Sequence, residues 1–422
     1  MCSRSGKVIE KAPHETPPLY SVPTPSSAKG SRSKLRRFIA LPEPTVLVLG
    51  ARRTPPVAAP AATPNTNSTI AICTSVGFRP LDANDFAART EELGADMVVG
   101  LGDVPYGRAL GSKRIEKAVA RSEAWLREHV RVRRDKAEDA GDAGEGRGAL
   151  FASLLPVTCA KQRDYVDFIS QELVDDLQGL AVYDLATLED VPETLHHFPR
   201  LGFTEPQTPQ QVLQHITRGL DLVTIPFITT ATDAGIALFF TFPAPTSTTE
   251  STTPQSQPTS PNITQETPRK KEPLGHDLCS PHHATSLTPL TPNCPCYACT
   301  NHHRAYISHL LNAKEMLGWT LLQLHNHAVI DAFFSGVRYV LAEGVEIFER
   351  EVERFEMFYE DGLPERTGKG PRVRGYQYRS EGPGEKRRNE APFTALTVDE
   401  GREKVEEALE ETANGPSDPD ID

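Results

Sequence analysis

Short apolar runs alternate with helical patterns along residues 68–242 of the chain. Six runs are rich in apolar and β-branched residues and are bounded by glycine, proline or aspartate, which predicts strands. They lie at 68–73, 95–102, 149–157, 179–185, 220–227 and 236–242. Most intervening segments carry apolar residues at helical spacing, such as Ile115, Val119 and Trp125 after a candidate N-cap at Ser112. This alternation predicts a parallel sheet covered by helices.

An α/β barrel of the TIM (β/α)8 type is the predicted fold. The chain has 422 residues, which is enough for one large barrel. It has no Gly-x-Gly-x-x-Gly turn, which a dinucleotide-binding sheet would need. The barrel is therefore preferred to a dinucleotide-binding fold, and we expect its first part at 36–243 and its end within 293–382.

Four segments differ in composition from this core and are dominated by proline, serine, threonine, glycine or charged residues. They lie at 1–35, 138–148, 244–292 and 383–422. Such segments bury too little apolar surface to offset the chain entropy lost on ordering. We therefore predict that they are disordered, with 244–292 forming a long loop and 383–422 a flexible tail.

Three cysteines within six residues form the strongest candidate for a site: Cys294, Cys296 and Cys299 in CPCYAC. This spacing brings three sulfur donors onto one turn, and a distant histidine would complete a tetrahedral zinc site. Four protein ligands leave no position for substrate, so the zinc would be structural. The alternatives are buried free thiols or a redox pair.

The fourth ligand is predicted to be His325. It follows an apolar stretch and precedes Asn326, a candidate N-cap for an amphipathic helix that would include Ile330 and Phe334. A ligand at such a junction would lie on a rigid element. Other candidates are near in sequence, namely Cys279, His282, His283, His302, His303, His309 and His327.

Cysteine content and hydropathy predict a cytoplasmic location. The chain has seven cysteines, an odd number, which suits a reducing compartment better than a disulfide framework. The first thirty residues contain no secretory apolar region, and the most apolar stretch is interrupted by Asp233 and threonines. Peripheral contact with an organelle membrane stays open at this stage.

The formal net charge of -12 does not suit extensive nucleic-acid contact, which requires local positive charge. Three basic clusters are candidates for such contact, and a solvated surface is the alternative for each. They are Lys34, Arg36 and Arg37; Arg131, Arg133 and Arg134; and Arg372, Arg374 and Arg379 with Tyr376 and Tyr378. An acidic subunit that touches RNA through one small patch, while a partner does most of the binding, would reconcile these features.

The stretch CPCYACTNHHRAYISHLLNAKEMLGWTLLQLHNH resembles the zinc segment of the tRNA-guanine (queuine) transglycosylases. Further similar stretches lie at 75–81, 112–126, 198–203 and 218–227, so the resemblance covers the folded part of the chain. It implies a TIM-type barrel with a C-terminal zinc-binding subdomain and one structural Zn²⁺. The implied process is the exchange of guanine for queuine at the wobble position of tRNAs with GUN anticodons.

The nucleophile of the family is missing. In catalytic members a carboxylate at a strand end attacks the ribose C1′ of the tRNA guanosine, and Thr224 stands at that position here. A threonine hydroxyl needs an adjacent base, and no histidine or lysine lies within several residues. Asp221 is expected on the opposite face of the strand, because side chains alternate. The arginine expected soon afterwards is also absent.

A second carboxylate is ambiguous. Asp103 follows a predicted strand near the place where the family carries another aspartate, and a loop or cap aspartate is the alternative. The segment 179–190 lacks the double glycine and the Gly-Glu of the family's base-binding loop.

An intact zinc motif without a nucleophile resembles the family's non-catalytic accessory members. The resemblance implies a heterodimer with the catalytic subunit of queuine tRNA-ribosyltransferase, paired near the zinc region, and tRNA bound through the complex. Two alternatives are an active transglycosylase that uses Asp103 or Asp233, and a stand-alone zinc-containing RNA-binding protein.

Overall fold

The computed structural model describes residues 2–3, 33–42, 45–52, 59, 64–74, 77–104, 111–140, 147–245 and 271–365. Its strands are β1 (Cys2–Ser3), β2 (Val48–Leu49), β3 (Thr69–Thr74), β4 (Gly77–Asp82), β5 (Met97–Val99), β6 (Ala149–Ser153), β7 (Gly179–Val182), β8 (Arg200–Gly202), β9 (Leu222–Val223), β10 (Ile236–Leu238) and β11 (Gly275–Asp277).

The α-helices are α1 (Lys34–Phe38), α2 (Ala83–Leu93), α3 (Ser112–Ala140), α4 (Arg163–Glu172), α5 (Pro209–Thr217), α6 (Phe227–Asp233), α7 (Tyr297–Asn301), α8 (Arg304–Asn312), α9 (Met316–Glu343) and α10 (Val345–Phe358). Short 3-10 helices lie at Cys159–Gln162, Leu185–Leu188, Glu193–Leu195 and Pro281–His283. No helix in the described part of the chain combines the length and hydropathy needed to cross a bilayer.

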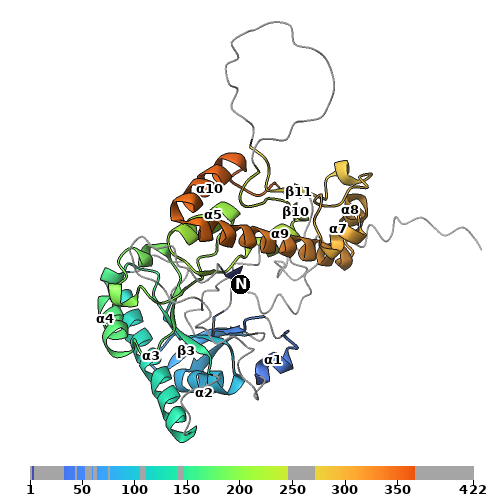
Figure 1. Ribbon diagram of the computed structural model, residues 1–422. Coiled ribbons are helices and arrows are strands. Elements are labelled where there is room, and N and C mark those ends of the chain that lie inside the picture. Colours follow the sequence, from blue (N-terminus) through green and yellow to red (C-terminus); the bar gives the residue numbers. More distant parts are fainter. Residues whose placement is uncertain are drawn as a thin grey trace, which may run out of the picture. The chain divides into compact units, whose positions relative to one another are not determined.

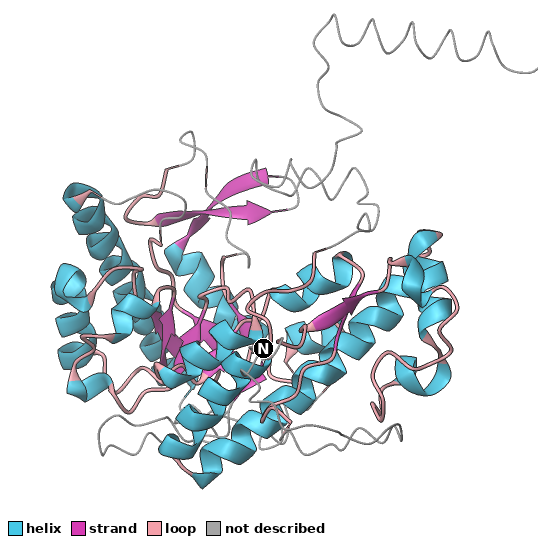
Figure 2. Cartoon of the chain, turned by 90° about the horizontal axis from the view of Figure 1, so that it is seen from above, coloured by secondary structure: helices cyan, strands magenta, loops and turns pink. Residues whose placement is uncertain are grey.

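The main sheet is a curled parallel half-barrel. Its order is β2-β5-β6-β7-β8-β9, all parallel, and β1 adds an antiparallel edge beside β9. From β5 onward, consecutive strands are neighbours, as in a (β/α)8 barrel. Figure 2 shows this sheet with helices around it, and Figure 1 shows β10 and β11 beside the long helix α9, where they form a separate pair. The predicted α/β barrel architecture is confirmed as a parallel half-barrel sheet surrounded by helices. Among the described strands, hydrogen bonding does not continue from β9 to β10.

Alternate residues of the sheet face two different cores. Met97, Phe151 and Leu201 pack together on one face, whereas Val98 and Leu150 pack against Trp125 of α3 and Tyr165 of α4 on the other. Both faces are therefore apolar, as expected for parallel strands covered by helices. Gly179 opens β7 because any Cβ there would overlap the Phe151 ring.

The strand and helix predictions agree with the structure in most places. α3 begins at Ser112, and all six predicted strand runs contain strands, but two of these strands, β3 and β10, lie in separate two-stranded sheets and not in the parallel sheet. The run 220–227 is shorter as a strand than predicted, because α6 begins at Phe227. The sequence pattern did not reveal the short β2 and β8, each of which has three residues or fewer.

The predicted disordered segments lie mostly outside the described residues, including 246–270 of the loop expected at 244–292. The remainder of that loop is different from the prediction. Residues 271–292 contain β11 and bury Leu274, Leu278 and Leu290. These leucines are isolated among polar residues in the sequence, so the segment shows no apolar pattern. Their burial depends on partners that are distant in the chain.

A second layer is built around α9, which lies beside β10 and β11, with α7 and α8 near one end and α10 near the other (Figure 1). Its core is aromatic: Phe333 of α9 contacts Phe240, Phe242 and Phe355. Gly336 lets α9 approach the strand-like segment after β10, because a Cβ at this position would overlap the carbonyl of Phe242.

Substituting Gly336 with alanine is expected to destabilise the protein by about 1–3 kcal/mol, because the added methyl must push α9 away from the Phe242 backbone. Ser335→Ala, at the adjacent exposed position of the same helix, should change stability by less than about 0.5 kcal/mol. Chemical denaturation measures both. Equal stability of the two variants would contradict the close packing of α9.

Candidate metal centre

The structure brings Cys294, Cys296, Cys299 and His325 together. Nδ1 of His325 lies 3.7, 3.6 and 3.4 Å from the three sulfur atoms, in that order, and all four ligand atoms lie within 4.8 Å of one another. Typical zinc bond lengths in a tetrahedral site give a sulfur–nitrogen separation of about 3.6 Å. The donor set and its spacing therefore fit zinc, with no place left for substrate.

Local structure explains how the cysteines converge. Cys296 is the N-cap of α7, and its sulfur accepts a hydrogen bond from the backbone N–H of Cys299, one turn later. Cys294 lies in the turn just before this cap. The short helix thus holds the three sulfur atoms, and α9 brings His325 from a distant part of the sequence.

The other ring nitrogen of His325 is held by strand β10. Nε2 lies 2.8 Å from the carbonyl oxygen of Leu238, and that carbonyl can only accept. The Nε2 atom therefore carries the proton and donates, which leaves the lone pair of Nδ1 for a metal. The carbonyl contact fixes both the tautomer and the orientation of the ligand.

Asn326 is not the N-cap predicted from the sequence. α9 runs without a break from Met316 to Glu343, so Asn326 is in the middle of the helix. Its fully buried side chain accepts from Leu238 N–H at 2.9 Å and donates to the Ile236 carbonyl at 3.0 Å and to the Thr232 hydroxyl at 3.0 Å. The His-Asn pair therefore satisfies the backbone groups of β10 that face away from β11.

Burial affects the protonation of His325, Cys294 and Cys299. It lowers the pKa of His325 to about 4, so the imidazole is neutral at physiological pH. Burial also raises the pKa of Cys294 and raises that of Cys299 to about 12. A metal ion must therefore displace thiol protons when it binds.

The other candidate ligands have different roles. His303 is the N-cap of α8, His302 stacks on Tyr306 and His327 contacts Gln323. Cys279 packs near the cysteine cluster but is not part of the group that fits a metal.

Thr224 is held by the backbone. It follows β9, its N–H donates to the Gly202 carbonyl, and its hydroxyl donates to the same oxygen at 3.2 Å. No histidine, lysine or carboxylate in the described part of the chain forms a hydrogen bond with this hydroxyl. Asp221 precedes β9 and accepts from the Arg200 N–H, and Asp233 ends α6. Asp221 therefore lies at the opposite end of the strand from Thr224.

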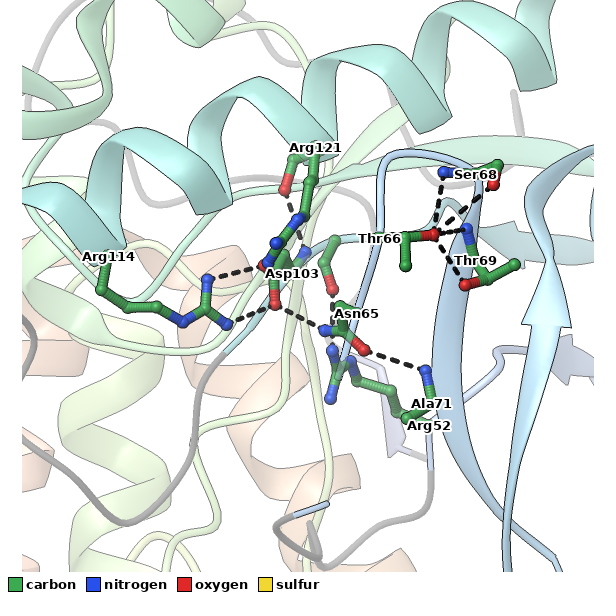
Figure 3. Close-up of polar contacts among 11 residues, drawn as sticks. Arg52, Asn65, Thr66, Ser68, Thr69, Ala71, Asp103, Arg114 and Arg121 are labelled. Carbon is green, nitrogen blue, oxygen red and sulfur yellow. Dashed lines mark hydrogen bonds and ion pairs between the residues drawn. The ribbon is translucent and has the colours of Figure 1, made fainter. Parts of the chain in front are cut away.

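Asp103 is fully buried at the end of the segment after β5 (Figure 3). Arg114 donates to both carboxylate oxygens at 2.6 and 2.7 Å, Arg121 donates at 3.0 Å, and Asn65 donates at 2.7 Å. Burial alone would raise the pKa of Asp103, but the hydrogen bonds from the two arginines outweigh it and hold the pKa below its usual value. The carboxylate is thus a poor proton acceptor that ties α3 to the sheet.

Several arginines of the basic clusters singled out in the sequence are paired with carboxylates. Arg36 is buried and pairs with Asp96 at 2.5 Å, whereas Arg131 and Arg134 form ion pairs with carboxylates. The third cluster, at 372–379, lies outside the described residues. The sequence did not reveal the partners of Arg36 and Arg134, because Asp96 and Asp176 lie in other segments of the chain. Arg131, in contrast, pairs with Glu128 and Asp135 of its own helix.

Comparison with known proteins agrees with this geometry. The family model described as queuine tRNA-ribosyltransferase matches residues 15–360. The protein named queuine tRNA-ribosyltransferase accessory subunit 2 of Schizosaccharomyces pombe is 32% identical over 344 residues, covering 81% of this chain and 71% of the relative. Proteins of the same name from Xenopus laevis and Homo sapiens are 30% and 29% identical, covering 66% and 65% of this chain and 71% and 70% of their own length. The chain belongs to the queuine tRNA-ribosyltransferase family.

Proposed function

We propose that this chain is a non-catalytic, zinc-binding subunit that pairs with a catalytic queuine tRNA-ribosyltransferase subunit. In this role it supports the exchange of guanine for queuine at the wobble position of tRNAs with GUN anticodons. The observation that carries the proposal is an assembled Cys3His centre beside a barrel whose nucleophile position holds Thr224. The names of the relatives support the same role.

Zinc would be held by Cys294, Cys296, Cys299 and His325, one ion per chain. When bound, it cross-links α7 to α9 and performs no chemistry on substrate. Through His325 the same link reaches Leu238 of β10. We therefore assign the metal a structural role in docking α7 and α9 onto β10.

The absence of chemistry is supported by the surroundings of the candidate groups. The Thr224 hydroxyl donates to a carbonyl and, among the described residues, has no hydrogen-bonded base to activate it. The Asp103 carboxylate accepts hydrogen bonds from two arginines and an asparagine. These contacts also weigh against an active enzyme that uses Asp103.

The surface near the metal centre suits a protein partner. Large apolar side chains are unusually exposed on α7 and the first turns of α9, namely Tyr297, Met316, Leu317 and Leu324. Exposed apolar groups of this kind are typical of protein interfaces. We infer that the catalytic subunit covers them, and that the heterodimer works in the cytoplasm, where reducing conditions keep the cysteines available for zinc.

The metal is tested with Cys296→Ser. Purified wild-type chain should hold about one zinc ion, and the variant should lose it and unfold at a lower temperature, because structural zinc contributes directly to folding. Cys279→Ser is the matched control, since Cys279 packs near the cluster without belonging to it. Elemental analysis that finds full zinc in Cys296→Ser would contradict the ligand set.

Catalysis is tested by exchange of labelled guanine or queuine into tRNA. The wild-type chain alone should show no turnover, and adding it to the catalytic subunit should raise activity. Thr224→Asp should also be inactive alone, because catalytic groups act as a unit and other parts of the site differ. Thr224→Asn is the size-matched control, because asparagine has the shape of aspartate without its carboxylate. Turnover by the unmodified chain would refute the proposal, and turnover by Thr224→Asp alone would show that only the nucleophile is missing.

Pairing is tested with Leu324→Arg, which places a charge on the apolar surface near the metal centre. Affinity for the catalytic subunit should fall at least about tenfold, because the charge would have to be buried in the interface. Met357→Arg is the control, because Met357 is also exposed but lies on α10. Equal effects of the two variants in analytical ultracentrifugation would place the partner elsewhere.

A further inference from the structure

Four cations share one side of the first three turns of α3. Lys113, Lys117 and Arg121 are spaced at i, i+4 and i+8, and Arg114 lies next to them. With the periodicity of an α-helix, all four fall within about 100° of the helix circumference. We call them the cationic stripe. Like charges at this spacing repel each other, so the arrangement has a cost in the isolated chain.

The rest of α3 shows how this chain normally neutralises its arginines. Arg127 pairs with Glu123 and Glu172, and Arg131 pairs with Glu128 and Asp135. Arg134 likewise pairs with Asp176.

The cationic stripe is not neutralised in this way. Its two arginines share the single carboxylate of Asp103, and neither exposed lysine forms an ion pair with any described residue. The sequence from Ser112 to Ser122 contains one acid, Glu116, and the first helical turn contains none. The N-terminus of a helix carries partial positive charge, so acids are the favoured residues there. The stripe and Asp103 together leave a local net charge of +3, from four cations and one anion, in a chain whose formal net charge is -12.

The arginines retain donors for a ligand. Arg114 uses two nitrogens and Arg121 uses one to bind Asp103, and each guanidinium has more N–H groups than these contacts engage. The remaining donors reach solvent, because no nitrogen of either arginine is among the buried atoms that lack a partner. Asp103 thus holds both guanidinium groups in fixed positions, as Figure 3 shows, without consuming their capacity to bind an anion.

We propose that the cationic stripe binds backbone phosphates of the tRNA. The stripe begins where the chain leaves β5, at the end of the parallel sheet where α/β barrels bind their ligands. Arginine and lysine side chains at a helix N-terminus provide the charge and the N–H donors that phosphate needs. This inference rests on the proposed function: an acidic accessory subunit would contact tRNA through this one patch.

The test measures binding of an unmodified tRNA transcript with a GUN anticodon to the complex of this chain with the catalytic subunit, over a range of salt concentrations. Lys113→Gln with Lys117→Gln leaves the hydrogen bonds of Asp103 unchanged, and Arg121→Gln leaves the paired hydrogen bonds from Arg114. Each change should weaken binding about tenfold at low salt. It should also reduce the slope of log K against log salt by about one for each phosphate that the variant no longer neutralises.

The matched control is Arg131→Gln with Arg134→Gln, which removes two charges from the same helix where carboxylates already neutralise them. It should leave both affinity and salt slope unchanged. Stripe variants that bind tRNA like the wild type, or a control that weakens binding equally, would overturn the inference. Pairing is measured in the same samples: a wild-type chain that does not pair would refute the proposed function, whereas intact pairing with unaffected tRNA binding would refute the stripe alone.

Discussion

The hydrogen bond from His325 to the Leu238 carbonyl connects the candidate metal centre to strand β10. One ring nitrogen faces three sulfur atoms and the other binds the backbone of β10, so a single imidazole serves both the metal centre and the β10-β11 pair. Asn326 strengthens the link by binding the N–H of Leu238 and the carbonyl of Ile236. Buried polar groups are costly when they lack partners, so this pair of side chains takes the place of a neighbouring strand.

The same link explains why β10 leaves the main sheet. Its outward-facing backbone groups are already satisfied by α9, and its other edge pairs with β11. The parallel strands therefore form a half-barrel, and the antiparallel pair β10-β11 lies outside it beside α9. The group that could hold a metal, the docking of α9 and the pairing of β10 are therefore linked through His325 and Asn326.

The ends of the barrel strands retain polar residues, but these residues bind one another. Thr224 donates to the carbonyl of Gly202, and Asp103 is surrounded by donors from α3 and Asn65. A catalytic group needs an open coordination or hydrogen-bonding position for its substrate. The hydrogen bonds of Thr224 and Asp103 are instead made within the protein, and Asp103 positions two arginines whose combined charge exceeds its own.

Local patterns in the sequence determined much of this protein. The alternation of apolar runs and helical periods predicted the parallel sheet, and the spacing of Cys294, Cys296 and Cys299 predicted a metal centre. Both patterns depend on residues close together in the chain, and for such residues the spacing in the sequence determines how their side chains lie relative to one another. His325 was a less secure choice among several histidines, and the tertiary structure selected it because α9 brings this histidine to the three sulfurs.

Features that depend on distant partners were decided only by the tertiary structure. The sequence predicted Asn326 as a helix cap, but its side chain binds the backbone of β10. The sequence also predicted that 271–292 is disordered, because its few leucines are buried only by elements distant in the chain. Arg36 and Arg134 proved to be paired with carboxylates of other segments of the chain. The four residues of the cationic stripe lie within 113–121 of the sequence, and only the helix brings them onto one side. Charge and polarity can be counted along a chain, but whether a group is paired or available depends on what the fold places next to it.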